Sequence, residues 1–352
     1  MLAFAPQRVL IIKPSAVGDI VHALPVLPRL RRLWPDARIT WMATPGCAGL
    51  VQNHPLVDEV ILFQRKRLAR GWYNPFALLD LAGMVHELRL RRFDLVIDLQ
   101  GLLRSASVAM ASGAPRRVGF SNAREGAPLF YTDLVDCSME LDHAVERYLK
   151  VTAALGCADG IIEFPFAVDE DDRRFIRELI PPGTRYAVLA PGTNWATKRW
   201  PVERFAALVE PLRERFGLET VVAGAAADRP LTARISARFD LTGKTTLRQA
   251  VALLERAELV VANDTGPMHI AAALGRPLVA PYGPTGVRRT GPFGRFDSVV
   301  RLDLPCSPCY SRTCSHHSCM EWLQIEPLLS VAADQIARYS HTVVESARGI
   351  EH

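Results

Sequence analysis

Short runs of apolar residues alternate with longer amphipathic stretches along the whole chain. Each run has the length of a buried strand, and the stretches between have helical periodicity. Because repeated strand–helix–strand units form parallel sheets covered by helices, the pattern predicts an α/β protein. The expected strands lie at 8–13, 37–43, 60–63 and 95–99 in the first half, and at 186–190, 219–223, 259–262 and 277–281 in the second.

The helical stretches are less regular than the strands. Pro25 and Pro28 lie inside 20–33, so we expect that helix to be short, kinked or broken. Acidic residues and Pro181-Pro182-Gly183 interrupt the periodicity at 165–183, where we place a linker. We therefore expect two Rossmann-like domains, at 1–170 and 171–335, and a C-terminal segment at 336–352. Further helices are expected at 81–91, 202–216, 247–257, 267–274 and 326–345.

Composition narrows the class of protein. The chain of 352 residues is 49% hydrophobic and 22% charged, values typical of globular proteins, which excludes a mainly disordered chain. The net charge of +5 is too small for a general nucleic-acid binder. Residues 65–124, however, hold eleven Lys/Arg against four Asp/Glu, a local charge of 11 − 4 = +7. This excess suits an anionic substrate or an anionic membrane face, although a solvated helix face at 89–92 explains part of it equally well.

The chain shows no sign of export or membrane insertion. No window approaches the ~18 uncharged apolar residues of a membrane span, and the apolar run 9–12 is too short for a signal peptide because Lys13 follows at once. We therefore expect a cytoplasmic protein. Seven cysteines in a chain of this length do not form the framework of a small secreted domain.

Four of the cysteines form a cluster near the C-terminus, with His316 and His317 inside it. Its spacing is tighter than that of the usual paired zinc knuckles. A structural Zn or Fe site, free packed thiols and disulfides all remain open. The cluster consists of Cys306, Cys309, Cys314 and Cys319.

Ser15-Ala16-Val17-Gly18-Asp19 follows the first expected strand. Ligands of open α/β sheets bind at the carboxyl ends of the strands, so Asp19 is a candidate general base. The alternative is that Asp19 only caps the next helix, a role that uses the same carboxylate oxygens. The glycine-rich fingerprint of dinucleotide-binding proteins is absent.

Two motifs in the second half have the character of anion sites. Residues 191–201 (PGTNWATKRWP) offer amides and hydroxyls around Lys198, a mobile charge that can meet a phosphate, although an ordinary surface loop is equally open. Residues 261–269 (VANDTGPMH) run from a strand through a tight turn into a helix, whose N-terminus suits a pyrophosphate. Asp264 can hold sugar hydroxyls there, and His269 is either a ligand contact or a packed core histidine.

These motifs, in this order, resemble those of glycosyltransferase family 9, the lipopolysaccharide heptosyltransferases. The resemblance covers nearly the whole chain and includes DLQGL at 98–102, RRVGF at 116–120, HAVER at 143–147 and YGPT at 282–285. It implies a GT-B fold of two Rossmann-like doubly wound domains facing a cleft, with the C-terminal helix crossing back to the first. It also implies inverting transfer of L-glycero-D-manno-heptose from ADP-heptose to the anionic lipopolysaccharide core, without a catalytic metal or other cofactor. Such an enzyme works peripherally at the cytoplasmic face of the inner membrane.

The resemblance also implies roles for individual residues. Asp19 matches the catalytic base and Lys198 the lysine at the donor phosphates. The acceptor is expected on the first domain, at Ser15, Gly18, Arg116, Arg117 and Arg124. Cysteines like those of the cluster occur only in some relatives. The residues expected to bind the donor, besides Lys198, are Thr193, Asn194, Asp228, Thr245, Asp264, Thr265, Gly266 and His269.

Three other functions stay open at this stage. A relative could act on another acceptor, such as a protein or a heptose already in the core. Rossmann halves also serve nucleotide-dependent oxidoreductases, against which the missing glycine fingerprint argues. A sugar-nucleotide binder without catalysis is the third alternative.

Overall fold

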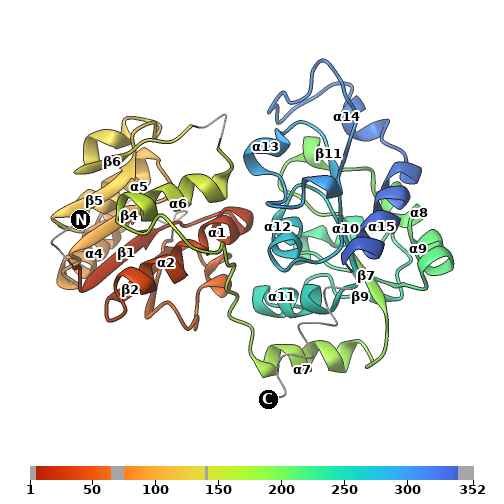
Figure 1. The fold of residues 1–352 in the computed structure, drawn as a ribbon, viewed down its shortest axis with the longest axis horizontal. Helices are drawn as coiled ribbons and strands as arrows, with labels where there is room; N and C mark the ends of the chain where they lie inside the picture. The colour runs from red at the N-terminus through yellow and green to blue at the C-terminus, as the bar shows by residue number, and fades with distance from the viewer. Residues whose placement is uncertain (1–4, 65–74, 139–141, 340–352) are drawn as a thin grey trace. The chain divides into compact units, whose positions relative to one another are not determined.

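The computed structural model describes residues 5–64, 75–138 and 142–339 (Figure 1). The chain divides into two compact units, Met1–Ala167 and Val168–His352, and each is built on one sheet. The division lies close to the boundary after residue 170 that the sequence predicts.

The first unit contains six parallel strands in the order β3-β2-β1-β4-β5-β6. Its strands are β1 (Arg8–Ile12), β2 (Arg38–Ala43), β3 (Glu59–Leu62), β4 (Leu95–Asp98), β5 (Arg116–Phe120) and β6 (Asp133–Val135). Its helices are α1 (Val17–Ala23), α2 (Val26–Leu33), α4 (Pro75–Leu90), α5 (Leu103–Ala111) and α6 (Ala144–Ala154), with short turns η1 (Ala48–Leu50) and η2 (Ala127–Phe130).

The second unit repeats this architecture in the order β12-β11-β10-β7-β8-β9. Its strands are β7 (Tyr186–Ala190), β8 (Glu219–Val222), β9 (Phe239–Asp240), β10 (Leu259–Ala262), β11 (Leu278–Tyr282) and β12 (Val299–Arg301). Its helices are α7 (Glu170–Leu179), α8 (Val202–Ala207), α9 (Val209–Phe216), α10 (Arg229–Thr232), α11 (Leu247–Arg256), α12 (Gly266–Ala273), α13 (Val287–Thr290), α14 (Ser318–Glu321) and α15 (Ile325–Tyr339), with short turns η3 (Ala196–Lys198), η4 (Ala226–Asp228) and η5 (Phe296–Ser298).

Both sheets therefore have the Rossmann strand order, 3-2-1-4-5-6 when the strands of each unit are counted along the chain. The order reverses between β1 and β4 in the first unit, and between β7 and β10 in the second. Ligands of such sheets bind beyond the carboxyl ends of the strands at this reversal. The residues after β1, β4, β7 and β10 are thus the first places to look for a site.

Several expected elements differ in detail. The stretch 20–33 is broken as predicted, into α1 and α2, because Pro25 cannot continue the first helix. The single helix expected at 202–216 is two helices, α8 and α9, which meet at Leu208. The C-terminal helix α15 ends at Tyr339 within the described residues, and the rest of the segment expected at 336–352 lies outside them.

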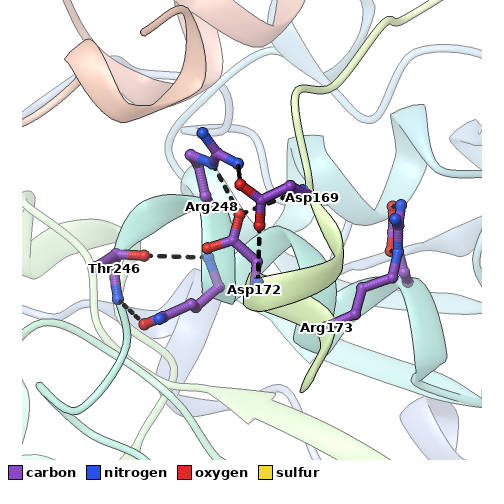
Figure 2. A network of polar contacts seen from close by, with 7 residues as sticks. Asp169, Asp172, Arg173, Thr246 and Arg248 are labelled. Carbon is purple, nitrogen blue, oxygen red and sulfur yellow. Dashed lines mark hydrogen bonds and ion pairs between the residues drawn. The ribbon is translucent and has the colours of Figure 1, made fainter. Parts of the chain in front are cut away.

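The linker expected at 165–183 is wrong in part, since helix α7 occupies its middle. Asp169 caps the helix, accepting a hydrogen bond from the Asp172 amide at 2.9 Å. Arg248 of α11 then binds both Asp169 and Asp172 (Figure 2). Arg173 pairs with Glu255 of the same helix. Charges on α11, together with the buried side chain of Ile176, therefore hold this helix in place.

Each unit has its own apolar core. One cluster around Leu10, Met42 and Val96 lies in the first unit, and a larger one around Trp200 and Phe205 lies in the second. Among the helices that the structure describes, none has the length and apolarity needed to cross a bilayer.

Candidate functional site

Asp19 lies beyond the carboxyl end of β1, in the first turn of α1. It is the third residue of the helix, and Ala16, not Asp19, occupies the capping position. Its Oδ2 accepts a hydrogen bond from the Ala16 amide at 2.9 Å. The side chain is nonetheless 42% exposed. The carboxylate of Asp19 therefore binds the helix N-terminus and is also accessible to solvent, whereas the sequence pattern presents capping and catalysis as alternatives.

Lys13, the residue after β1, is a member of this site that the sequence analysis missed. Its Nζ lies 3.8 Å from Asp19 Oδ1 and donates to the Leu99 carbonyl at 3.3 Å, and the side chain is only 3% exposed. Burial alone would lower the pKa of Lys13, but the charge of Asp19 and the neighbouring Tyr148 raise it above its usual value. A charged ammonium group thus lies beside one carboxylate oxygen of Asp19. The sequence signal that could have identified Lys13 is its position directly after a strand and just before the motif at 15–19.

A small cavity of about 40 Å³ lies at the same edge of this sheet. Ser15, Gln100, Arg104 and Ser105 supply its polar lining. Gln100 Oε1 is buried with no hydrogen-bond partner among the described residues. Such an orphaned acceptor is costly unless a donor binds it, so the cavity suits a ligand hydroxyl. The sequence pattern assigns no role to Gln100 or Arg104.

Asp98 at the end of β4 anchors the loop that carries Gln100. It is fully buried and accepts hydrogen bonds from the Gln100 amide at 2.8 Å, the Gly101 amide at 3.2 Å and the Tyr131 hydroxyl at 2.7 Å. Burial raises the pKa of Asp98 despite these bonds. Its contacts are internal, so its role is to fix the loop.

The three arginines expected to bind an acceptor differ in their surroundings. Arg116 forms an ion pair with Asp133. Arg117 donates to the carbonyls of Phe130 at 2.8 Å and Ala114 at 2.7 Å. Arg124 is exposed, while its amide binds the Gly101 carbonyl at 3.0 Å. Arg116 and Arg117 therefore stabilise the β5–β6 edge, and Arg124 is the one of the three whose side chain is open to solvent.

In the second unit, residues after β7, β10 and β11 meet on one buried carboxylate. Asp264 is 6% exposed, and its Oδ2 receives Lys198 Nζ at 2.6 Å and the Thr285 hydroxyl at 2.6 Å. His269 Nε2 lies 3.7 Å from Oδ1. Burial would raise the pKa of Asp264, but the hydrogen bond from His269 and the charge of Lys198 hold it well below its usual range. We call this arrangement of Lys198, Asp264, His269 and Thr285 the lysine cradle.

The lysine cradle changes two sequence-based expectations. Asp264 is not open to sugar hydroxyls, since its oxygens are occupied by protein donors. Lys198 is not a freely mobile charge, since Asp264 fixes it, although it retains 16% exposure. His269 is a buried partner of Asp264, which agrees with the alternative of a packed histidine.

Thr193, Asn194, Thr265 and Gly266 lie at the same edge of the sheet. Asn194 is exposed and Thr193 is half-buried. Thr265 caps α12, whose helical residues begin at Gly266, so the amide groups of the first turn end at this edge. The buried side chain of Asn263 fixes the distance between the loop after β7 and the turn after β10. It accepts a hydrogen bond from the Trp200 amide at 3.1 Å and donates one to the Pro191 carbonyl at 2.8 Å. The loop after β7 and the turn after β10 are thus tied together.

Asp228 reaches this edge from the loop after β8. A Cβ atom on Gly192 would lie 2.4 Å from its carboxylate, and one on Gly224 would lie 2.9 Å from it. Both glycines are therefore required by the close approach of Asp228. Thr245 follows Gly243, which packs against Ala226 of the same loop and has a positive φ of 68°. Because the Gly243 amide donates to the Gly224 carbonyl at 2.9 Å, Thr245 lies near the end of β8.

The cysteine cluster forms a loop and the start of α14. All four cysteines are free thiols; Cys306, Cys309 and Cys314 are exposed and Cys319 is buried. Burial and the nearness of Cys309, Cys314 and Cys306 raise the pKa of Cys319. Throughout the part of the chain that the structure describes, no three His, Cys, Asp or Glu side chains gather as a metal site requires. A structural Zn or Fe site thus finds no support among these residues.

A scan against family models matches residues 82–320 to glycosyltransferase family 9 (heptosyltransferase). The chain belongs to glycosyltransferase family 9. Lipopolysaccharide heptosyltransferase 1 of Pseudomonas aeruginosa is 31% identical over 319 residues, which cover 88% of each chain. Lipopolysaccharide heptosyltransferase 2 of Escherichia coli is 29% identical, covering 84% of this chain and 88% of its own. The structure of E. coli heptosyltransferase WaaC with ADP-2-deoxy-2-fluoro heptose has a TM-score of 0.71 and 29% identity, covering 84% of this chain and 93% of that one.

Membership of family 9 confirms the predicted GT-B fold of two Rossmann-like parallel-sheet domains. It also identifies the chain as a glycosyltransferase of the heptosyltransferase family, in lipopolysaccharide core synthesis. The oxidoreductase alternative is therefore wrong. The chain is about equally similar to heptosyltransferases 1 and 2, with identities of 31% and 29%.

Proposed function

We propose that this family 9 enzyme transfers L-glycero-D-manno-heptose from ADP-heptose to the anionic inner core of lipopolysaccharide, with inversion and with Asp19 as general base. The observation that carries the proposal is that each of the two sheets has a lysine–aspartate pair at the point where its strand order reverses. Lys13 and Asp19 follow β1, and Lys198 and Asp264 follow β7 and β10. One solved relative holds an ADP-heptose analogue, which supports ADP-heptose as the donor.

On the donor side, Lys198 and the first turn of α12 meet the diphosphate. Charge grows on the leaving ADP as the glycosidic bond breaks, and a fixed cation with helix amides stabilises it. Asp264 holds Lys198 in place before the donor arrives, so little reorganisation is needed. Thr193, Asn194, Thr265 and Gly266 complete the phosphate contacts, while Asp228 and Thr245 take the adenosine.

On the acceptor side, Asp19 accepts the proton of the attacking hydroxyl as the new bond to the anomeric carbon forms. Inversion follows because the hydroxyl attacks from the face opposite the departing ADP. The Ala16 amide holds Oδ2 and Lys13 approaches Oδ1, so the carboxylate has a fixed orientation. A carboxylate is a weak base compared with the alkoxide it helps to form, so proton transfer comes late in the step.

The acceptor binds near Ser15 and Gly18 on the first unit. The small cavity beside Ser15, Gln100 and Arg104 takes a sugar hydroxyl, and the exposed Arg124 meets an acidic group of the core. Arg116 and Arg117 support this region through their ion pair and carbonyl contacts. Because this acceptor carries a lipid, the enzyme works at the cytoplasmic face of the inner membrane, in peripheral contact with it.

No metal is required for this chemistry in our proposal, because Lys198 and the α12 amides neutralise the leaving diphosphate. Activity is therefore expected to survive an excess of EDTA unchanged. A loss of turnover with EDTA that Mg²⁺ restores would assign the diphosphate to a metal ion instead.

The general base is tested with Asp19→Asn, which keeps the size of the side chain and one oxygen for the Ala16 amide. We expect turnover to fall about 10²- to 10⁴-fold, the range for loss of a general base, with ADP-heptose affinity changed less than about twofold. Exposed Asp36 provides a control, and Asp36→Asn should match the wild type. ADP release is measured with truncated core acceptors.

Near-normal turnover of Asp19→Asn would remove Asp19 from the mechanism. Turnover of the wild type only on a non-core acceptor would favour the alternative of a different acceptor.

A further inference from the structure

The cysteine-containing segment contacts the residues next to Lys198 of the lysine cradle. We call residues 306–319 the Cys-rich loop. The Thr197 hydroxyl donates to the Ser311 carbonyl at 2.8 Å, and His317 Nε2 lies 2.8 Å from the Thr197 carbonyl. The Arg312 guanidinium carbon lies 4.6 Å from the centre of the Trp195 ring. Three contacts thus fix the backbone beside Lys198 from a segment more than a hundred residues away.

The same loop also holds the segment that carries Thr285. The amides of Cys309 and Tyr310 donate to the Pro284 carbonyl at 3.1 and 2.7 Å. The Ser307 hydroxyl donates to the Gly283 carbonyl at 2.7 Å. A Cβ atom on Gly286 would lie 2.4 Å from the Tyr310 hydroxyl, so the two segments are in close contact.

These two anchored segments are the ones that meet on Asp264. Lys198 comes from the first and Thr285 from the second, and each reaches Asp264 Oδ2 at 2.6 Å. The Cys-rich loop therefore ties together, from outside the sheet, the two sides of the lysine cradle. Small displacements of groups that bind a reacting ligand are costly, so such a tie matters for binding.

We propose that the Cys-rich loop positions the lysine cradle for the donor diphosphate, with His317 as its principal positioning residue. The inference rests on the proposed function in taking a nucleoside diphosphate as the ligand. His317 suits the role because a carbonyl oxygen can only accept, so Nε2 must donate to Thr197. Its amide also donates to Cys314 Sγ at 3.2 Å, and its Nδ1 lies 3.6 Å from Glu321 Oε1. The thiol of Cys314 thus belongs to the support of His317.

The test compares ADP binding by calorimetry in wild type, His317→Ala, His317→Gln and His316→Ala, well below the unfolding temperature of each. Loss of one hydrogen bond of about 1 kcal/mol predicts roughly fivefold weaker ADP binding for His317→Ala. His317→Gln, which keeps an N–H donor, should recover affinity to within about twofold. His316 binds Ser318 at 2.9 Å and does not touch the cradle, so His316→Ala serves as the matched control and should bind like the wild type.

The outcomes separate this inference from the proposed function. If the wild type binds ADP and His317→Ala binds it equally well, the positioning role is overturned while the donor site stands. If the wild type binds no ADP, the donor site itself fails, and this inference with it. Should His317→Ala not fold, Thr197→Val replaces it, because it removes the bond to the Ser311 carbonyl. Unchanged ADP affinity in that variant would equally overturn the inference.

Discussion

Each unit has one lysine–aspartate pair at the reversal of its strand order, and the two pairs are built in opposite ways. In the first unit the lysine is buried and the aspartate is open, with exposures of 3% for Lys13 and 42% for Asp19. In the second the aspartate is the more buried partner, with 6% for Asp264 against 16% for Lys198. In each pair the buried member fixes the other, which faces outward. This difference suits a base on one unit and a phosphate-binding cation on the other.

The lowered pKa of Asp264 makes a prediction about stability and pH. A carboxyl group whose pKa is lower in the folded than in the unfolded state stabilises the fold above its unfolded pKa of ~3.9. That contribution is lost as the pH falls below this value toward the folded pKa. Asp264→Asn should therefore lower the free energy of unfolding by about 3 kcal/mol at pH 7, the cost of breaking a buried pair, and by progressively less below about pH 4.

Urea unfolding of wild type and Asp264→Asn at pH 7, 5, 4 and 3 measures this difference. Exposed Asp303 serves as the control, and Asp303→Asn should match the wild type at every pH. A difference between wild type and Asp264→Asn that stays constant down to pH 3 would contradict the assigned ionisation of Asp264.

For individual residues, the sequence predicts which ones lie near the candidate sites, but not which side chains each of them contacts. Lys198, Asp264 and His269 all lie where their motifs suggest. Their mutual pairing could not be predicted, because it depends on side-chain directions after two separate strands. Lys13 and Gln100 were missed for a related reason. A lysine after an apolar run and a glutamine in a turn have no distinctive spacing, and only their burial makes them unusual.

Among the elements, strands with continuous apolar runs are the most predictable, as β1, β7 and β10 show. Four strands of the two sheets were missed. β6, β9 and β12 are only two or three residues long, and β5 begins with two arginines that a buried strand does not usually contain. They were missed because their pairing depends on neighbouring strands and not on their own composition.

Helix α7 was assigned to a linker for a similar reason. Only Asp172 and Ile176 are buried in it, so its apolar face is narrow. Besides the buried Ile176, its position is fixed by Arg248 on α11, 76 residues after Asp172 in the chain. Such a long-range ionic contact leaves no local pattern in the sequence.

Arg248 therefore makes a prediction about this helix. Arg248→Ala removes the contacts to Asp169 and Asp172 that Figure 2 shows, and should cost about 1–2 kcal/mol of unfolding free energy. Amide hydrogen exchange in α7 should accelerate. Arg174, which pairs with Asp171 on the helix surface with exposures of 60% and 78%, is the matched control, and Arg174→Ala should change neither quantity measurably. Equal effects of the two substitutions would show that Arg248 does not dock the helix.

For the molecule as a whole, the two units repeat one strand order and contain separate cores. A truncation in one core should therefore loosen mainly its own unit. Phe205 is fully buried and packs edge-on against Trp200, with 5.0 Å between ring centres. Phe205→Ala is expected to cost about 3–5 kcal/mol.

Amide hydrogen exchange followed by mass spectrometry locates the effect of this truncation. Exchange should rise in peptides from the second unit, with those from Met1–Ala167 unchanged. A uniform rise across both units would mean that the two sheets unfold as one.

The strand order also has a consequence for the emergence of the chain from the ribosome. β1 is made first but lies in the middle of its sheet, between β2 and β4. β2 and β3 can add to one side early, whereas the other side of β1 must wait until Leu95–Asp98 has been translated. At roughly 5–20 residues per second, an apolar hydrogen-bonding edge stays unpaired for seconds during synthesis. Nascent-chain chaperones have that interval in which to protect the growing polypeptide from association with other chains.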